Sequence, residues 1–94
     1  LYSNKLLFMN INELIEIVKS KIEAEIVMQD VKIEDKSFLH KNHKGNQEGM
    51  FHLKLIIKSE ELKRLNKIES TKKIYSILNL ELKEHIHSIQ ILLS

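Results

Sequence analysis

The chain contains no cysteine, no proline and only two glycines among its 94 residues. Without cysteine it can form no disulfide, cannot act through a thiol nucleophile, and cannot ligate an iron–sulfur cluster with thiolates of its own. Any such cluster would need sulfur ligands from a partner. The length fits one domain, and the composition offers no linker. No apolar run approaches the roughly 20 residues that cross a bilayer, so the sequence predicts no membrane segment.

Arginine is almost absent as well. Fourteen lysines and a single arginine supply the positive charge, and the formal net charge is +2 with neutral histidine. So small a net charge gives little steering toward nucleic acid, and the guanidinium that best reads guanine edges is scarce. The densest basic cluster, which holds the candidate nucleic-acid contacts, comprises Lys63, Arg64, Lys67, Lys72 and Lys73. Neighbouring glutamates offset part of the positive charge of this cluster, so a solvated helix face is the alternative interpretation.

Histidine is the residue type that the chain does have, with five copies in two groups. His40, His43 and His52 lie in or beside one polar segment, and His85 and His87 follow the last predicted helix. Imidazole is the commonest metal ligand, so the two groups could form one site if the fold joins them. The alternatives are solvated side chains for the loop pair, an exposed sheet residue for His52, a helix-dipole cation for His85 and a buried structural role for His87.

Hydrophobic periodicity predicts the element order α-β-β-α-α-β. The expected elements are a helix over 11–23, a strand over 26–34, a loop over 35–49, a strand over 50–58, a short helix over 60–65, a longer helix after Asn66 and a strand over 86–93. Capping residues mark the helix starts: Asn10 or Asn12 for the first, Ser59 for the second and Asn66 for the third. The long polar loop is of the kind that often carries function.

The same periodicity predicts which faces are buried. The longer helix should bury the stripe formed by Ile68, Thr71, Tyr75, Leu78 and Leu82, widened by Ile74 and Ile77. Alternation in the last strand places His87, Ile89, Ile91 and Leu93 on one side of the sheet.

These elements predict an α/β (α+β) fold with a three-stranded mixed sheet and helices on one face. The two middle strands should pair antiparallel, and the last strand should join them in parallel after a helical crossover. We expect one domain over residues 11–94, preceded by a disordered, processed or vector-derived segment over residues 1–10. No nucleophile lies beside a base and an orienting group, and no phosphate-binding glycine loop or zinc helix occurs. The sequence therefore indicates a binding module, not an enzyme.

From Asn12 to Leu92 the chain resembles the BolA family. The segments that carry the resemblance are EDKSFLH (34–40), FHLKLIIKS (51–59), KIYSILNLEL (73–82) and IHSIQI (86–91). The family's acid-serine segment before the loop corresponds to Asp35 and Ser37, and its His-aromatic pair corresponds to His52–Leu53 with leucine in place of the aromatic. Its aliphatic-His-small-aliphatic signature corresponds to 86–89.

The resemblance implies a fold similar to class II KH domains and a monothiol glutaredoxin as partner. In such heterodimers a two-iron two-sulfur (2Fe-2S) cluster is shared, and the glutaredoxin with its glutathione supplies the sulfur ligands. By resemblance the ligands from this chain are His87 and the loop histidine His40, with His43 as the alternative, which is the histidine-loop subtype. The chain alone would be a monomer without cofactor. The compartment stays open between mitochondrial and cytoplasmic.

The alternative function is a DNA-binding transcriptional regulator of the BolA type. Two features argue against nucleic-acid binding. The BolA family's Arg-His-Arg run reads Ser70, Thr71, Lys72 here, and the Gly-x-x-Gly clamp of RNA-binding KH domains does not occur, since Gly45 and Gly49 are one residue too far apart.

Overall fold

The computed structural model describes residues 10–37 and 50–94. Its elements are α2 (Ile11–Glu25), β1 (Asp30–Asp35), β2 (Phe51–Lys58), α3 (Glu60–Lys63), α4 (Lys67–Ile77), α5 (Asn79–Glu84) and β3 (Ile86–Leu93). The predicted order of elements is confirmed except that the second helix before the last strand is divided into α4 and α5, and the last strand has the predicted bounds. None of the helices described is long and apolar enough to cross a membrane.

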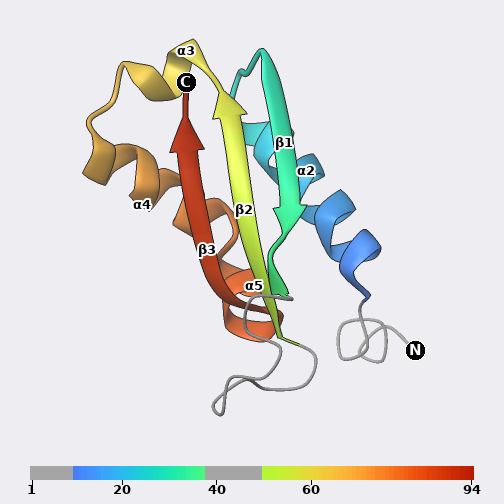
Figure 1. Ribbon diagram of the computed structural model, residues 1–94. Helices are drawn as coiled ribbons and strands as arrows, with labels where there is room; N and C mark the ends of the chain where they lie inside the picture. The colour runs from blue at the N-terminus through green and yellow to red at the C-terminus, as the bar shows by residue number, and fades with distance from the viewer. Residues whose placement is uncertain (1–9, 38–49) are drawn as a thin grey trace.

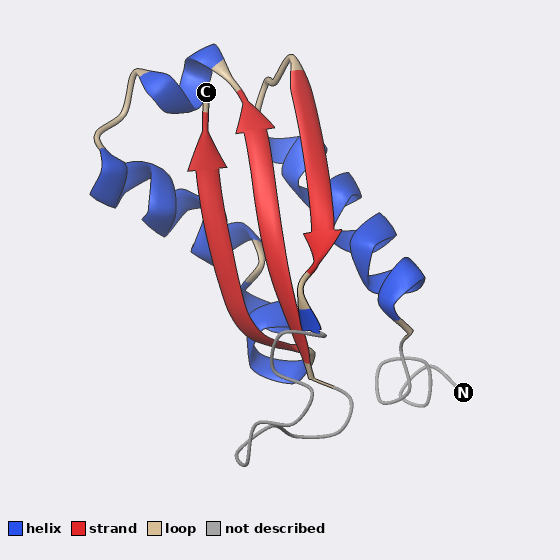
Figure 2. Ribbon diagram, viewed as in Figure 1, coloured by secondary structure: helices blue, strands red, loops and turns tan. Residues whose placement is uncertain are grey.

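The strands form one mixed sheet in the order β1-β2-β3. β1 pairs with β2 antiparallel, and β2 pairs with β3 in parallel. A parallel neighbour requires a crossover, which α3, α4 and α5 provide. The helices lie on one face of the sheet and leave the other open (Figures 1 and 2). The predicted α+β class, with its three-stranded mixed sheet and helices on one face, is confirmed.

The core forms between this helical layer and the covered face of the sheet. α2 contributes Leu14, Val18 and Ile22, whose spacing of four residues makes one apolar stripe. β2 contributes alternate residues, which share one face of a strand. The fully or nearly fully buried apolar residues are Leu14, Val18, Ile22, Ile26, Leu53, Leu55, Ile57, Leu62, Ile74, Leu78 and Ile86.

The predicted buried stripe of the longer helix is wrong at two positions. Ile68 and Tyr75 are 68% and 43% exposed, whereas α4 buries Ser70 and Ile74 and the chain then buries Leu78. The apolar residues of this helix lie on several of its sides, so tertiary packing determines which side is buried. Ser70 tolerates burial because its hydroxyl donates to the Lys67 carbonyl. The predicted single helix also breaks at Leu78, which separates α4 from α5.

The first strand begins later than predicted. α2 continues to Glu25, and Ile26 is its C-cap. The segment that follows reverses direction, leaving Val27 71% exposed. Pairing with β2 starts where the Gln29 N–H donates to the Lys58 carbonyl at 2.8 Å. The alternation at 26–29 therefore belongs to a connection and not to a strand.

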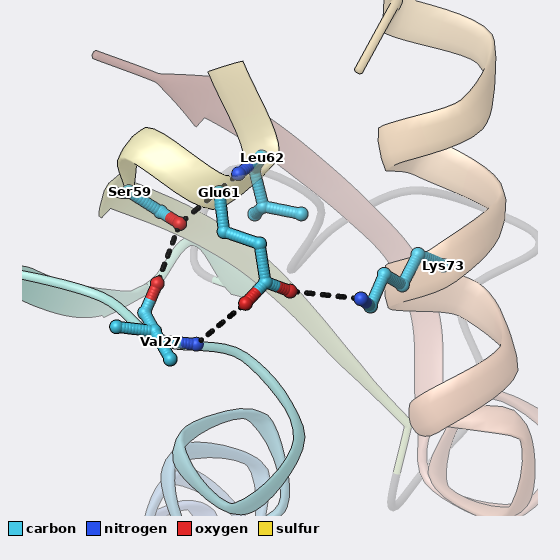
Figure 3. Close-up of polar contacts among 5 residues, drawn as sticks. All are labelled: Val27, Ser59, Glu61, Leu62 and Lys73. Carbon is cyan, nitrogen blue, oxygen red and sulfur yellow. Dashed lines mark hydrogen bonds and ion pairs between the residues drawn. The ribbon is translucent and has the colours of Figure 1, made fainter. Parts of the chain in front are cut away.

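Side-chain contacts of Ser59 and Glu61 fix this connection to two helices (Figure 3). Ser59 Oγ accepts the Leu62 N–H at 3.2 Å, as an N-cap, and donates to the Val27 carbonyl at 2.8 Å. One Glu61 oxygen accepts the Val27 N–H at 3.2 Å, and the other lies 2.8 Å from Lys73 Nζ. The turn between α2 and β1 is thereby joined to α3 and α4.

We expect Glu61 to stabilise the fold in a pH-dependent way. The contact with Lys73 first, and the Val27 N–H second, lower the pKa of its carboxyl. A carboxyl whose folded pKa is lowered stabilises the fold above its unfolded pKa, and this contribution is lost as pH falls through the folded pKa. Glu61→Gln should therefore lower the free energy of unfolding at neutral pH, and its effect should vanish in acid. Urea unfolding across this pH range tests it.

The control for this experiment is Glu16→Gln, because Glu16 is exposed and forms no ion pair within residues 10–37 and 50–94. A Glu61→Gln effect that persists unchanged in acid would show that the ion pair is not its origin.

Leu55 lies fully buried in the middle of β2 and should carry a large share of the packing. Leu55→Ala removes buried methyl groups and leaves a cavity, so it should lower the free energy of unfolding by about 2–5 kcal/mol. Val27→Ala is the matched control, with an expected change within about 0.5 kcal/mol at an exposed site. Chemical denaturation measures both, and equal effects would contradict the position of the core.

Candidate functional site

A β-bulge at the start of β3 determines where His87 lies. The β2–β3 register pairs Phe51 with Ile86 but His52 with Ser88, so His87 is an extra residue without a partner in β2. A bulge re-aims the side chains beside it. His87 is exposed, and its ring lies beside that of His52, with centroids 4.9 Å apart and an interplanar angle of 55°. The prediction that His87 shares a side with Ile89 is therefore wrong.

His52 is the buried member of this pair. It lies on the face of β2 opposite the core yet is only 4% exposed, so the predicted exposed sheet residue is also wrong. Its ring Nδ1 lies 2.7 Å from Ser88 Oγ. Its backbone N–H donates to Ser37 Oγ at 3.1 Å, and its carbonyl accepts the Lys36 N–H at 2.7 Å. The side chain of His52 is thus held by β3, and its backbone is held by the residues that follow β1.

The acid-serine motif has a structural role at this site. The Ser37 N–H donates to Asp35 Oδ1 at 2.9 Å, which closes a local turn directly after β1. This turn presents the Ser37 hydroxyl to the backbone of His52. The described residues up to Ser37 therefore end in contact with the backbone of His52. The Asp35 and Ser37 motif is visible in the sequence. The contact of Ser37 with His52 is not, because it joins residues 15 positions apart and depends on the register between β1 and β2.

His85 is buried rather than solvated. It is 4% exposed and forms the C-cap of α5, where its N–H donates to the Glu81 carbonyl. Its own carbonyl accepts the Phe51 N–H at 2.8 Å. Its Nε2 is buried without a hydrogen-bond partner among the residues that the structure describes. His85 therefore lies at the helix C-terminus where it was predicted, with its side chain buried rather than in solvent.

The two predicted loop ligands, His40 and His43, lie outside the described residues. Within residues 10–37 and 50–94, no group of three or more histidine, aspartate, glutamate or cysteine residues could hold a metal ion. What the described part offers is an exposed imidazole at His87 beside an immobilised one at His52. A hollow of about 370 Å³ adjoins His52 on the open sheet face and is lined also by Lys36, Ser88 and Gln90. Such a surface suits a metal site whose other ligands come from another protein.

The predicted basic cluster is divided by the structure. Lys63, Arg64, Lys67 and Lys72 are exposed, but Lys73 is engaged 2.8 Å from Glu61. Lys73 therefore belongs to the structural contact between α3 and α4 rather than to a nucleic-acid surface. Of the exposed four, Lys63 and Lys67 line one groove beside β3.

The fold and the histidine pair define a small α+β binding domain with a surface imidazole at a strand bulge. A family model described as BolA-like protein matches residues 22–94. The curated protein named DNA-binding transcriptional regulator BolA, from Haemophilus influenzae, is 32% identical over 74 residues, covering 79% of this chain and 69% of that protein. The chain belongs to the BolA family.

Solved structures agree with this assignment. The BolA domain of SufE1 from Arabidopsis thaliana matches with a TM-score of 0.71 and 26% identity, over 84% of this chain and 87% of that one. BolA1 from the same plant has the same TM-score and coverage at 24% identity, which supports the fold alone.

Removing the hydroxyl of Ser88 should loosen the histidine pair. Ser88→Ala deletes the oxygen that lies 2.7 Å from Nδ1 of the buried His52. Losing a hydrogen bond at a buried polar group costs about 1–3 kcal/mol of unfolding free energy. The imidazole nitrogen resonances of His52 should also shift, as measured by long-range proton–nitrogen NMR. Ser20→Ala, on the exposed face of α2, is the control; an equally small effect of both would contradict the contact.

Proposed function

We propose that this protein shares a 2Fe-2S cluster with a monothiol glutaredoxin, with His87 as its principal ligand. The second ligand from this chain is the loop histidine His40, with His43 as the alternative, and the glutaredoxin with glutathione supplies sulfur. The observation that carries the proposal is the exposed His87 imidazole, turned onto the open sheet face by the bulge. The role falls within cluster assembly, cluster transfer or iron regulation.

The chemistry of the donor set fits such a cluster. Neutral imidazole can replace thiolate on one iron of a 2Fe-2S centre and raises its reduction potential. Since the chain has no cysteine, its own ligands must be nitrogen or oxygen. The described residues also form no complete site for a metal ion, which suits a cluster held between two proteins. A heterodimer is therefore the expected functional unit.

The contacts around His52 support a loop ligand close to His87. Ser37, the last described residue before the loop, contacts the backbone of His52, and the His52 ring lies beside that of His87. Three residues of chain cover at most about 11 Å, which limits how far His40 can lie from Ser37. His52, held by Ser88, would act as a neighbour that orients the ligand imidazole, as outer partners do in metal sites.

Cluster binding should depend on His87 and on pH. Anaerobic co-purification with a monothiol glutaredoxin and glutathione should yield a coloured heterodimer, and His87→Ala should abolish or strongly weaken its visible circular dichroism. Because protonated imidazole cannot bind metal, the wild-type signal should fall as pH is lowered from about 8 to about 5.5. His40→Ala and His43→Ala, measured separately, should identify the loop ligand by the larger loss.

Lys58→Ala provides the control on the open face, because Lys58 is exposed and lies at the opposite end of β2 from His52. Far-ultraviolet circular dichroism should show that each variant remains folded. A His87→Ala heterodimer with an unchanged cluster spectrum, or a wild-type spectrum that does not vary with pH, would contradict histidine ligation.

The second candidate is DNA binding, favoured by the name of the Haemophilus influenzae relative. The exposed cations Lys63, Arg64, Lys67 and Lys72 would make the phosphate contacts. A salt titration on duplex DNA separates the two functions, because phosphate contacts weaken steeply with salt. Strong binding at physiological salt would favour regulation, and negligible binding would leave cluster sharing.

A further inference from the structure

The outer edge of β3 is unpaired within residues 10–37 and 50–94, because β3 pairs with β2 alone in the described sheet. In a parallel pair, alternate residues direct both peptide groups toward the neighbour. The Ser94 N–H donates to the Ile57 carbonyl, so the peptide groups of Leu93 and Ile91 point the other way. An edge of this kind carries unsatisfied donors and acceptors and is a template for another strand.

A groove runs directly beside this edge. It has a volume of about 410 Å³ and lies between the C-terminal half of β3 and the helices α3 and α4. Leu62 and Leu65 line it from the helical side, and Ile91 and Leu93 line it from the strand. Leu62 is fully buried and Leu65 is partly exposed, so the groove has an apolar floor that solvent reaches. Such a floor fits an aliphatic side chain.

The rim of the groove is positively charged. Lys63 and Lys67 both line it, both are exposed, and no acidic residue is among the lining. Neither lysine takes part in an ion pair within the part of the chain that the structure describes. A ligand of this groove should therefore carry negative charge near its apolar group.

The open edge favours a peptide over a nucleic acid. A strand supplies both N–H donors and carbonyl acceptors and can pair with both kinds of edge group, whereas a phosphate backbone only accepts. KH domains approach the phosphate backbone through a Gly-x-x-Gly loop, but the α3–α4 connection here is Arg64-Leu65-Asn66 and contains no glycine.

We propose that this groove binds an extended acidic segment of a partner protein. The segment adds to β3 as a fourth strand, places an aliphatic side chain on the apolar floor and directs carboxylates to Lys63 and Lys67. The surface lies at the C-terminal half of β3, while His87 lies at its start, so the two sites can be occupied independently.

The probe for the test is a short blocked peptide in which valine and glutamate lie two residues apart, so that both face the groove when the peptide pairs as a strand, titrated into the uniformly nitrogen-15-labelled protein. Chemical-shift changes should concentrate at the amides of Leu65, Ile91 and Leu93. The same peptide with N-methylated alternate amides cannot pair as a strand and should not bind. A short single-stranded oligonucleotide serves as the phosphate probe.

A charge-reversal pair tests the rim. Lys63→Glu with Lys67→Glu should weaken peptide binding about tenfold or more, since two attractive contacts become repulsive. Lys19→Glu with Lys83→Glu changes the net charge equally at exposed sites on α2 and α5 and should leave affinity unchanged.

Four results would overturn the proposal. These are absence of peptide binding, equal binding of the N-methylated peptide, binding of the oligonucleotide but not of the peptide, and self-association through the β3 edge. The third would assign the groove to phosphate, and the fourth would assign it to a second copy of the chain. None of them depends on a bound cluster, so failure here is separate from failure of the proposed function.

Discussion

The placement of His87 depends on one extra residue in the parallel pairing of β2 with β3. Without this bulge, alternation would place its imidazole toward the helices, on the side of Ile89. With it, His87 is exposed and lies beside the buried ring of His52. The bulge is flanked by Ile86, which is buried in the core, and by Ser88, which contacts His52. Core packing on one side and a hydrogen bond on the other therefore hold the surface imidazole in place.

The rest of the fold supports this short stretch. The buried carbonyl of His85 accepts the Phe51 N–H and ties the end of α5 to the first residue of β2. At the opposite end of the sheet, contacts of Ser59 and Glu61 join the α2–β1 turn to α3 and α4 (Figure 3). The histidine pair lies at the start of β3 and the groove lies beside its C-terminal half, so the two proposed partners would engage different parts of the strand.

Much of the fold follows from local pattern, but the site does not. Ser59 and Asn66 cap the helices that their positions predicted, and the apolar alternation of β2 gives the core face. The bulge at His87 is a property of pairing between two strands, and its one trace in the sequence is that the core residues Ile86 and Ile89 are three positions apart, where regular alternation requires an even spacing. The burial of His52 likewise comes from contacts with distant residues.

The buried face of α4 was also not predictable from the sequence pattern alone. Ser70 looks polar in sequence, yet it is buried because its hydroxyl satisfies a carbonyl of its own helix, while Ile68 remains exposed. A local pattern indicates which faces of a helix could be buried, and the tertiary contacts together determine which one is.

Nitrogen ligation by this chain is tested most directly by pulsed electron paramagnetic resonance of the reduced heterodimer. The protein would carry nitrogen-15 histidine, and the glutaredoxin would be unlabelled. Histidine ligation predicts strong hyperfine coupling to nitrogen-15, diminished in His87→Ala and retained in Lys58→Ala. A reduced cluster that shows no nitrogen-15 coupling would contradict it.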